Sequence, residues 1–229
     1  INTPSLLVCG VPPHVALGTG KFASVLGSLT SLWTYARRGL VVKSIVPAGF
    51  VAALAGSMAG AGLALVLDSE MLGRVLVFLL PVGMAASVFA GRMGAREDGE
   101  LPERFLWSKV LGLCFFIGFY DGFFGPGTGT FFIIGLSLFL NIGLVRASAT
   151  AKVFNMASNA GALAVFATGG VVSYSLAIPL ALANIAGNQV GTRLAIKGGA
   201  QVVRRFVYVA LSLLLATLVY KFFLAGMGF

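Results

Sequence analysis

Long apolar stretches, separated by short polar segments, dominate the chain. Residues 45–67 and 153–192 contain no Asp, Glu, Lys or Arg, and residues 110–145 contain only Asp121. A helix of about 20 apolar residues crosses a bilayer. The longest uncharged stretch therefore predicts two spans that meet at Thr168-Gly169-Gly170. The pattern indicates an all-α polytopic membrane protein.

The apolar segments predict helices of two lengths. The segments long enough to span are 16–36, 45–67, 70–91, 144–168, 172–196 and 202–224. Two shorter segments, 105–120 and 130–140, flank a stretch from Asp121 to Gly129 that contains four glycines and a proline. Because glycine and proline interrupt helices, we expect these short segments to be half-helices that meet at a break.

An internal repeat organises these segments. Sliding the chain by 131 residues aligns Ala16–Lys21 with Ala147–Lys152, and residues 16–65 share 14 identities in 50 ungapped positions with their counterparts. We therefore predict a first membrane repeat at 1–91, a hydrophilic linker at 92–104 and a second repeat at 105–229. The same offset places the first copy of the glycine-rich break before Ile1, so we expect the first repeat to be truncated here, by about 26 residues.

The loop charges predict that the two repeats are inverted. The loop after 16–36 carries Arg37, Arg38 and Lys43, whereas its counterpart at 168–174 carries no charge. In the next pair of equivalent loops the bias is reversed, because the positive charge lies in the loop of the second repeat. Since positive loops favour the cytoplasm, equivalent loops of the two repeats would lie on opposite sides of the membrane. This inversion requires an odd number of crossings per repeat, which three full spans plus one half-helix pair provide. The alternative is eight plain spans, with 105–140 crossing once as a broken helix.

Composition excludes a water-soluble globule, because 58% of the residues are hydrophobic and only 10% are charged, whereas soluble domains are about 25% charged. The net charge of +9 resides in short loops rather than in a basic run with aromatics, so we expect no nucleic-acid partner. Cys9 and Cys114 lie in apolar surroundings without a Cys/His cluster. They predict two buried thiols, and we expect no metal and no cofactor.

The glycine-rich break is a candidate anion site. Gly125, Gly127, Thr128 and Gly129 lead directly into the segment 130–140. Free amides and the positive end of a helix dipole would converge there, and glycine lets an anion approach the backbone closely. The alternative is that these residues only form a tight re-entrant turn.

Two lysines inside apolar segments are the second candidates. Lys21 and Lys152 occupy the same repeat position, two residues after Thr19 and its counterpart Thr150. An ionisable residue within a membrane span suggests function. Lys152, Asn155 and Asn159 share one helix face because they follow i, i+3, i+7 spacing, and Lys21, Ser24 and Ser28 do the same. The alternative is that each lysine extends its amine to the interface.

Asp121 is the acid that lies outside the loops. At the C-terminal end of a half-helix it opposes the helix dipole, so stability alone does not account for it. Asp121 could carry a coupling proton, or neutralise Lys152 when the site is empty. A structural cap or ion pair is an equal alternative.

These residues resemble a known family. Asp121-Gly-Phe-Phe-Gly-Pro-Gly-Thr-Gly129 and Ala149-Thr-Ala-Lys152-Val-Phe-Asn155 resemble the second-half motif of the sulfite exporter TauE/SafE family, also called the toluene sulfonate uptake permease family. Gly10–Lys21 and Tyr35–Gly39 resemble its first-half pattern, although Gly20 stands where that family often has Asn. The resemblance covers essentially the whole chain.

The resemblance implies a multi-pass transporter of the prokaryotic cytoplasmic membrane that moves sulfite, sulfonates or related sulfur-containing anions. Our leading hypothesis is a secondary transporter, not an enzyme, whose partners are a small anion and the lipid bilayer; homo-oligomer formation stays open. The anion would be bound by Thr19, Lys21, Ser24, Gly125, Gly127, Thr128, Gly129, Lys152 and Asn155, with Asp121 as the candidate for proton coupling. The alternatives are a membrane-embedded enzyme acting on a lipid or phosphate substrate, and a non-transporting assembly protein.

Overall fold

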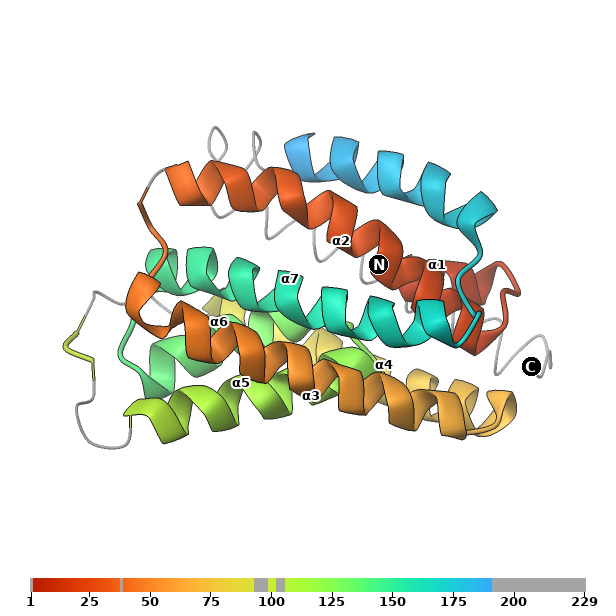
Figure 1. Cartoon of the computed structure of the whole chain (residues 1–229), viewed down its shortest axis with the longest axis horizontal. Coiled ribbons are helices and arrows are strands. Elements are labelled where there is room, and N and C mark those ends of the chain that lie inside the picture. Colours follow the sequence, from red (N-terminus) through yellow and green to blue (C-terminus); the bar gives the residue numbers. More distant parts are fainter. Residues whose placement is uncertain (1, 38, 93–98, 102–105, 191–229) are drawn as a thin grey trace.

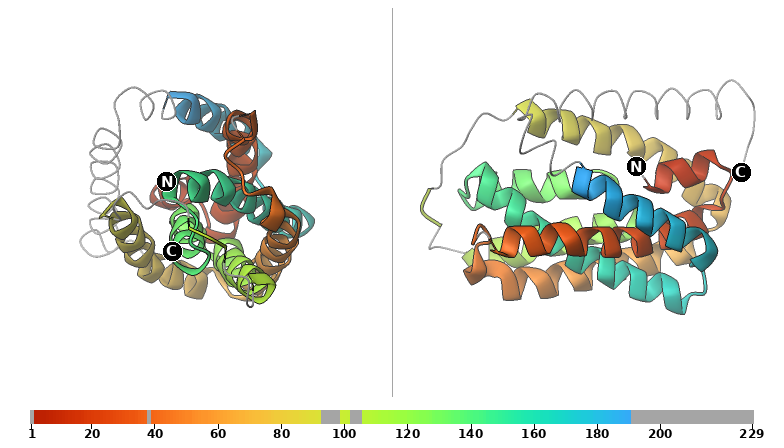
Figure 2. Two further views of the ribbon diagram at one scale, coloured as in Figure 1. Left: turned by 90° about the vertical axis from the view of Figure 1, so that its left-hand side faces the viewer. Right: turned by 90° about the horizontal axis from the view of Figure 1, so that it is seen from above.

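The computed structural model describes residues 2–37, 39–92, 99–101 and 106–190, and within these ranges the regular structure is entirely helical. The helices run roughly along one common axis (Figures 1 and 2). They are α1 (Asn2–Val8), α2 (Pro13–Arg37), the short 3₁₀ helix η1 (Lys43–Ile45), α3 (Val46–Val66), α4 (Ser69–Arg92), α5 (Leu106–Phe123), α6 (Thr128–Phe139) and α7 (Leu144–Thr168). Residues 174–190 are also helical.

The all-α fold class is confirmed for the described part of the chain. The predicted helix 144–168 coincides with α7, and the other predicted helices that are described agree within a few residues. The segment predicted at 202–224 and most of the predicted linker lie outside the described residues. Cys114 is buried as predicted, but Cys9 is exposed, so that prediction was wrong: Cys9 lies in the turn after α1 rather than in a packed helix.

The break between the half-helices is shorter than the predicted 121–129. Helix α5 continues to Phe123, and the N–H groups of Phe124 and Gly125 both donate to the Tyr120 carbonyl, at 2.8 and 3.3 Å. Helix α6 then begins at Thr128. Asp121 therefore lies in the last turn of α5, where its side chain is fixed by a regular backbone.

Helices α2 and α7 correspond closely to each other. Both are 25 residues long, and their bounds differ by 131 positions. They run in opposite directions in Figure 1. The Val42 N–H donates to Thr150 Oγ1 at 3.0 Å, and the Ser173 N–H donates to Thr19 Oγ1 at 3.1 Å. The donors of these two bonds, and also their acceptors, are 131 positions apart.

Helices α3 and α5 approach each other through glycines. A Cβ built on Gly56 or Gly60 of α3 would lie 2.1 Å from a carbonyl oxygen of α5. A Cβ on Gly122 of α5 would lie 2.0 Å from the Ser57 carbonyl oxygen of α3. Small residues at such spacing let helix backbones pack at very short range, as is common in membrane proteins. This close packing fixes the C-terminal half of α5, and with it Asp121.

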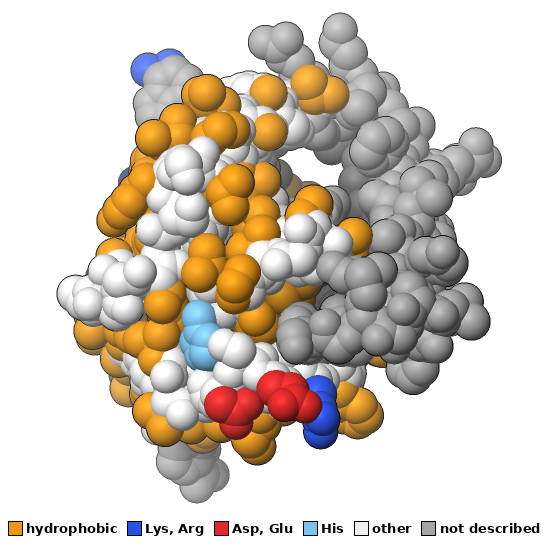
Figure 3. Space-filling view, turned by 90° about the vertical axis from the view of Figure 1, so that its right-hand side faces the viewer, with side chains coloured by type: hydrophobic (Ala, Val, Ile, Leu, Met, Phe, Trp, Pro, Cys, Tyr) orange, Lys and Arg blue, Asp and Glu red, His pale blue; other side chains and the backbone are white. Residues whose placement is uncertain are grey.

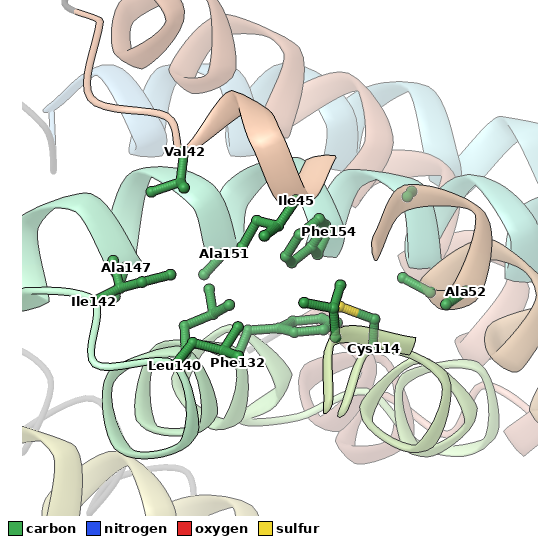
Figure 4. Close-up of a cluster of buried hydrophobic side chains, with 14 residues drawn as sticks. Val42, Ile45, Ala52, Cys114, Phe132, Leu140, Ile142, Ala147, Ala151 and Phe154 are labelled. Atoms are coloured by element: carbon green, nitrogen blue, oxygen red, sulfur yellow. The ribbon is translucent and has the colours of Figure 1, made fainter. Parts of the chain in front are cut away.

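A buried apolar cluster attaches α6 and α7 to the start of α3 (Figure 4). Phe132 of α6 and Phe154 of α7 pack with ring centroids 5.8 Å apart. Ile45, Cys114 and Leu140 complete the contact from the neighbouring elements. The cluster holds the short helix α6 in place, so that its N-terminus is presented to the interior.

The outer surface is apolar over wide areas (Figure 3). Val66, Phe78 and Phe116 are 81%, 78% and 72% exposed. Exposed large apolar side chains on this scale suit a lipid environment rather than water. Among the described helices, the segments Lys43–Val66 and Leu106–Phe123 are long and apolar enough to cross a membrane.

His14 connects separate elements at one end of the molecule. Its Nε2 lies 3.0 Å from the Ala64 carbonyl oxygen and 3.1 Å from that of Leu67, and its Nδ1 lies 3.2 Å from Ser69 Oγ. Acidic side chains lie near the histidine on this face (Figure 3). The imidazole thus links the start of α2 to the loop between α3 and α4.

The glycine packing predicts a position-dependent loss of stability. Gly122→Ala should lower the free energy of unfolding by about 1–3 kcal/mol, because the new methyl group meets the backbone of α3 and neither helix can yield cheaply. The measurement is the thermal unfolding midpoint of the purified protein in detergent.

Gly62 and Gly112 provide matched controls on the same two helices, because a Cβ at either position has nothing within 4 Å. Alanine there should leave stability unchanged or raise it slightly, through its higher helix propensity. Equal destabilisation by Gly112→Ala and Gly122→Ala would contradict the packing argument.

Candidate functional site

The break between α5 and α6 turns the chain without regular helix. Gly125 and Gly127 have φ angles of +96° and +86°, which glycine adopts readily. The Tyr120 hydroxyl donates to the Pro126 carbonyl at 2.8 Å, and the Thr128 hydroxyl donates to the Gly125 carbonyl at 2.6 Å. These bonds satisfy part of the irregular backbone in the interior of the helical bundle.

A buried ion pair lies directly beside this break. Lys21 Nζ of α2 is 2.8 Å from Asp121 Oδ1 and donates to the Asp121 carbonyl oxygen at 2.5 Å. The two side chains are 7% and 3% exposed. Such a pair is stable only when both charges are present, since removing one leaves an uncompensated buried charge.

Asp121 is also held from α7. The Ser158 hydroxyl donates to Asp121 Oδ2 at 2.6 Å. Both carboxylate oxygens are therefore occupied, one by a cation and the other by a neutral hydroxyl. The sequence left open whether Asp121 would neutralise Lys152 or form a structural ion pair; in this structure it pairs with Lys21.

Gly125 allows the lysine to reach the break. A Cβ at this position would lie 3.2 Å from Lys21 Nζ and 3.4 Å from Asp121 Oδ1. The positive φ angle separately disfavours any other L residue. The backbone and the ion pair thus fit together only with glycine here.

These groups border a cavity of about 170 Å³. Its lining includes eight of the residues singled out from the sequence: Lys21, Ser24, Asp121, Gly125, Gly127, Thr128, Gly129 and Asn155. The N–H groups of Gly127 and Gly129 have no backbone acceptor among the described residues. The lining therefore combines an ammonium group, unpaired backbone amides at the start of α6 and side-chain amides from α7.

Two of the predicted binding residues do not line the cavity. Thr19 is buried, and its hydroxyl accepts the hydrogen bond from Ser173 N–H. Lys152 lies on α7, one turn before Asn155, and contacts no acid among the described residues.

The lining also contains residues outside the predicted binding set: Asn2, Thr3, Gly20, Phe124, Pro126 and Asn159. Asn159 lies one turn after Asn155, so its place on the same helix face was visible in the sequence. Asn2 and Thr3 belong to α1, whose packing against α2 no local pattern indicates; Asn2 Nδ2 donates to Ser24 Oγ at 3.3 Å. Ser158, the partner of Asp121, lay beside the polar face and carried no signal of its own.

The arrangement suits binding of a small anion. A positive side chain and backbone amides at a helix N-terminus converge on a space that fits a compact ligand. Within the described ranges, no group of three or more His, Cys, Asp or Glu could hold a metal ion. The anion would meet donors from α2, α6 and α7.

Comparison with known proteins points to transport. The chain is 36% identical over 208 residues to a protein described as a probable membrane transporter from a Sinorhizobium species, covering 89% of this chain and 77% of that protein. It is 29% identical over 220 residues to a probable membrane transporter of Haemophilus influenzae, covering 96% of this chain and 86% of the relative. It is 27% identical over 220 residues to the probable membrane transporter YfcA of Escherichia coli K12, covering 96% and 81%.

No solved structure matches the chain. The sequence profile of the family described as sulfite exporter TauE/SafE matches residues 1–218. The match includes both the break and the two lysine-bearing helices, so it spans every element of the candidate site. The chain belongs to the sulfite exporter TauE/SafE family of membrane transporters.

Proposed function

We propose that this protein is a secondary transporter of small sulfur-containing anions, such as sulfite or organosulfonates, and that the anion binds in the cavity beside the α5–α6 break. The observation that carries the proposal is the buried ammonium group of Lys21 facing that break. A buried ion pair beside unpaired backbone amides is costly to maintain for stability alone, and an ionisable residue within a membrane protein interior suggests function. The family supports transport, and the sulfur-containing substrate class follows from its description.

The size and lining of the cavity favour a compact ligand. A volume of about 170 Å³ accommodates a small oxyanion together with a few waters. Lys21 would neutralise the charge, and the N–H groups of Gly127 and Gly129 would bind anion oxygens. Asn155, Thr128 and Ser24 would complete the hydrogen bonds, with Asp121 as the proton-coupling group.

We further propose that the chain is an inverted repeat and that transport proceeds by rocking one repeat against the other. The antiparallel course of α2 and α7, and their matching bounds, support this architecture. The two hydrogen bonds to Thr19 and Thr150 connect the repeats at equivalent places. Thr19 would then hold the loop before the helix at 174–190 in place, and would not bind the anion directly.

Lys152 would contribute to the same pathway from α7. It shares a face with Asn155 and Asn159, two residues of the cavity lining, and its charge would draw the anion toward them. We place the protein in the prokaryotic cytoplasmic membrane as a multi-pass protein, with a small anion and lipid as its partners.

The first transport prediction concerns the charge of Lys21. In proteoliposomes, radiolabelled sulfite flux should fall at least tenfold in Lys21→Met/Asp121→Asn, because the positive charge that binds the anion and the proposed proton-coupling carboxyl are both gone; a tenfold loss corresponds to ~1.4 kcal/mol. The double variant removes both charges together, so no unpaired charge remains buried and the fold is retained.

Lys109→Ala is the matched control, because Lys109 is an exposed lysine of α5 outside the cavity. It should transport at the wild-type rate. Lys152→Ala should reduce flux less than the loss of Lys21. Wild-type flux in the double variant would remove Lys21 from the site, and absence of flux for sulfite and organosulfonates in the wild type would refute the transporter proposal.

Inverted topology predicts opposite labelling of equivalent positions. Lys43 and Tyr174 are both exposed and differ by 131 positions. In a Cys9→Ser background, Lys43→Cys should react with an impermeant maleimide from the cytoplasmic side only, and Tyr174→Cys from the opposite side only. Right-side-out and inside-out vesicles separate the two cases, and labelling of both from one side would exclude inversion.

A further inference from the structure

The Ser158 hydroxyl has one proton and two acceptors in reach. It lies 2.6 Å from Asp121 Oδ2 and 3.1 Å from the Asn155 carbonyl oxygen. A hydroxyl can donate one hydrogen bond and accept others. Ser158 can therefore donate to an ionised Asp121, or donate to Asn155 while it accepts a hydrogen bond from a protonated Asp121. Both protonation states of the carboxyl group find a partner without movement of either helix.

The charge of the cavity makes the second state necessary when an anion binds. Among the described lining residues, Lys21 and Asp121 carry the charges, and these two charges cancel when the cavity is empty. An added anion would leave one uncompensated negative charge in a buried site, which is strongly unfavourable. A proton on Asp121 would restore neutrality and release the ammonium group of Lys21 to the anion.

We infer that anion binding is coupled to protonation of Asp121 at Oδ2, with the Ser158 hydroxyl as the switching partner. This inference rests on the proposed function and deepens its coupling step. The proton comes from the aqueous side from which the anion enters. It forms the Oδ2–H bond, and it leaves to water on the other side together with the anion. The site is neutral when empty, with Lys21 paired to Asp121, and neutral when loaded, with Lys21 paired to a monoanion.

The lysine need not move far for this exchange. Lys21 Nζ keeps its hydrogen bond to the Asp121 carbonyl oxygen, 2.5 Å away, when the ion pair with Oδ1 is given up. The carboxylate thus occupies one hydrogen-bonding position on the ammonium group, and the anion takes over this position. Asp121 acts as a tethered anion that competes with the substrate.

Lys152 is a further cation on α7, but it lies outside the described cavity lining and forms no ion pair with Asp121. The adjacent phenol of Tyr120 donates to the Pro126 carbonyl, so it is occupied within the break. The α7 side chains that line the cavity are the amides Asn155 and Asn159. Lys21 is therefore the described cation in contact with Asp121, and it loses its carboxylate partner when Asp121 takes up a proton.

Infrared difference spectroscopy of the reconstituted protein tests the inference, with sulfite as the probe. Adding sulfite to the wild type should produce the carbonyl stretch of a protonated carboxyl group. The band should be lost in Asp121→Asn and should shift in frequency in Ser158→Ala, and Ser158→Thr, which retains a hydroxyl, should restore it. Binding of radiolabelled sulfite is measured on the same samples.

Ser137→Ala is the matched control. Ser137 Oγ of α6 is buried and has no hydrogen-bond partner among the described residues, so its removal should leave the band unchanged. Sulfite binding to the wild type without a carboxyl band, a band that persists in Asp121→Asn, or an unshifted band in Ser158→Ala would overturn the inference while leaving the anion site in place. Absence of sulfite binding and flux would instead refute the proposed function, and this inference with it.

Discussion

A buried ammonium group must have a negative charge beside it, and in this protein that requirement connects distant parts of the chain. Lys21 of α2 and Asp121 of α5 are 100 residues apart in sequence and form a 2.8 Å ion pair. The pair lies where the α5–α6 break exposes backbone amides, so structural neutralisation and the proposed ligand binding involve the same atoms. Any change that separates α2 from α5 leaves two charges unpaired in a medium that cannot solvate them.

The surrounding helices are arranged so that this pair can form. Glycines let α3 and α5 approach at backbone distance, which places the last turn of α5. The apolar cluster around Phe132 and Phe154 holds α6 and α7 together, so that Ser158 reaches the second oxygen of Asp121. Gly125 then leaves room for the lysine at the break. Packing energy from apolar contacts thus offsets the cost of burying the charges.

The apolar pattern predicted the helices well, because helix formation over long apolar stretches depends on local composition. It also predicted the break, although Tyr120 hydrogen bonds extend α5 beyond the expected end. The candidate site was partly predictable for the same reason: Lys21, Asp121 and the glycines stand out as charges or helix breakers in apolar surroundings. Asn2 and Ser158 do not stand out, because small polar residues are common in helices and only their neighbours give them a role.

The sequence by itself determined that the chain is helical, apolar enough for lipid, and interrupted at a glycine-rich stretch, because each of these properties follows from residues close together in the chain. Only the tertiary structure decided which lysine Asp121 contacts. Lys21 and Lys152 occupy equivalent local settings, and nothing near either one distinguishes them. Helix packing brings Lys21 to Asp121 and leaves Lys152 one turn away from the cavity lining, since an ion pair depends on distance in space and not on position in the sequence.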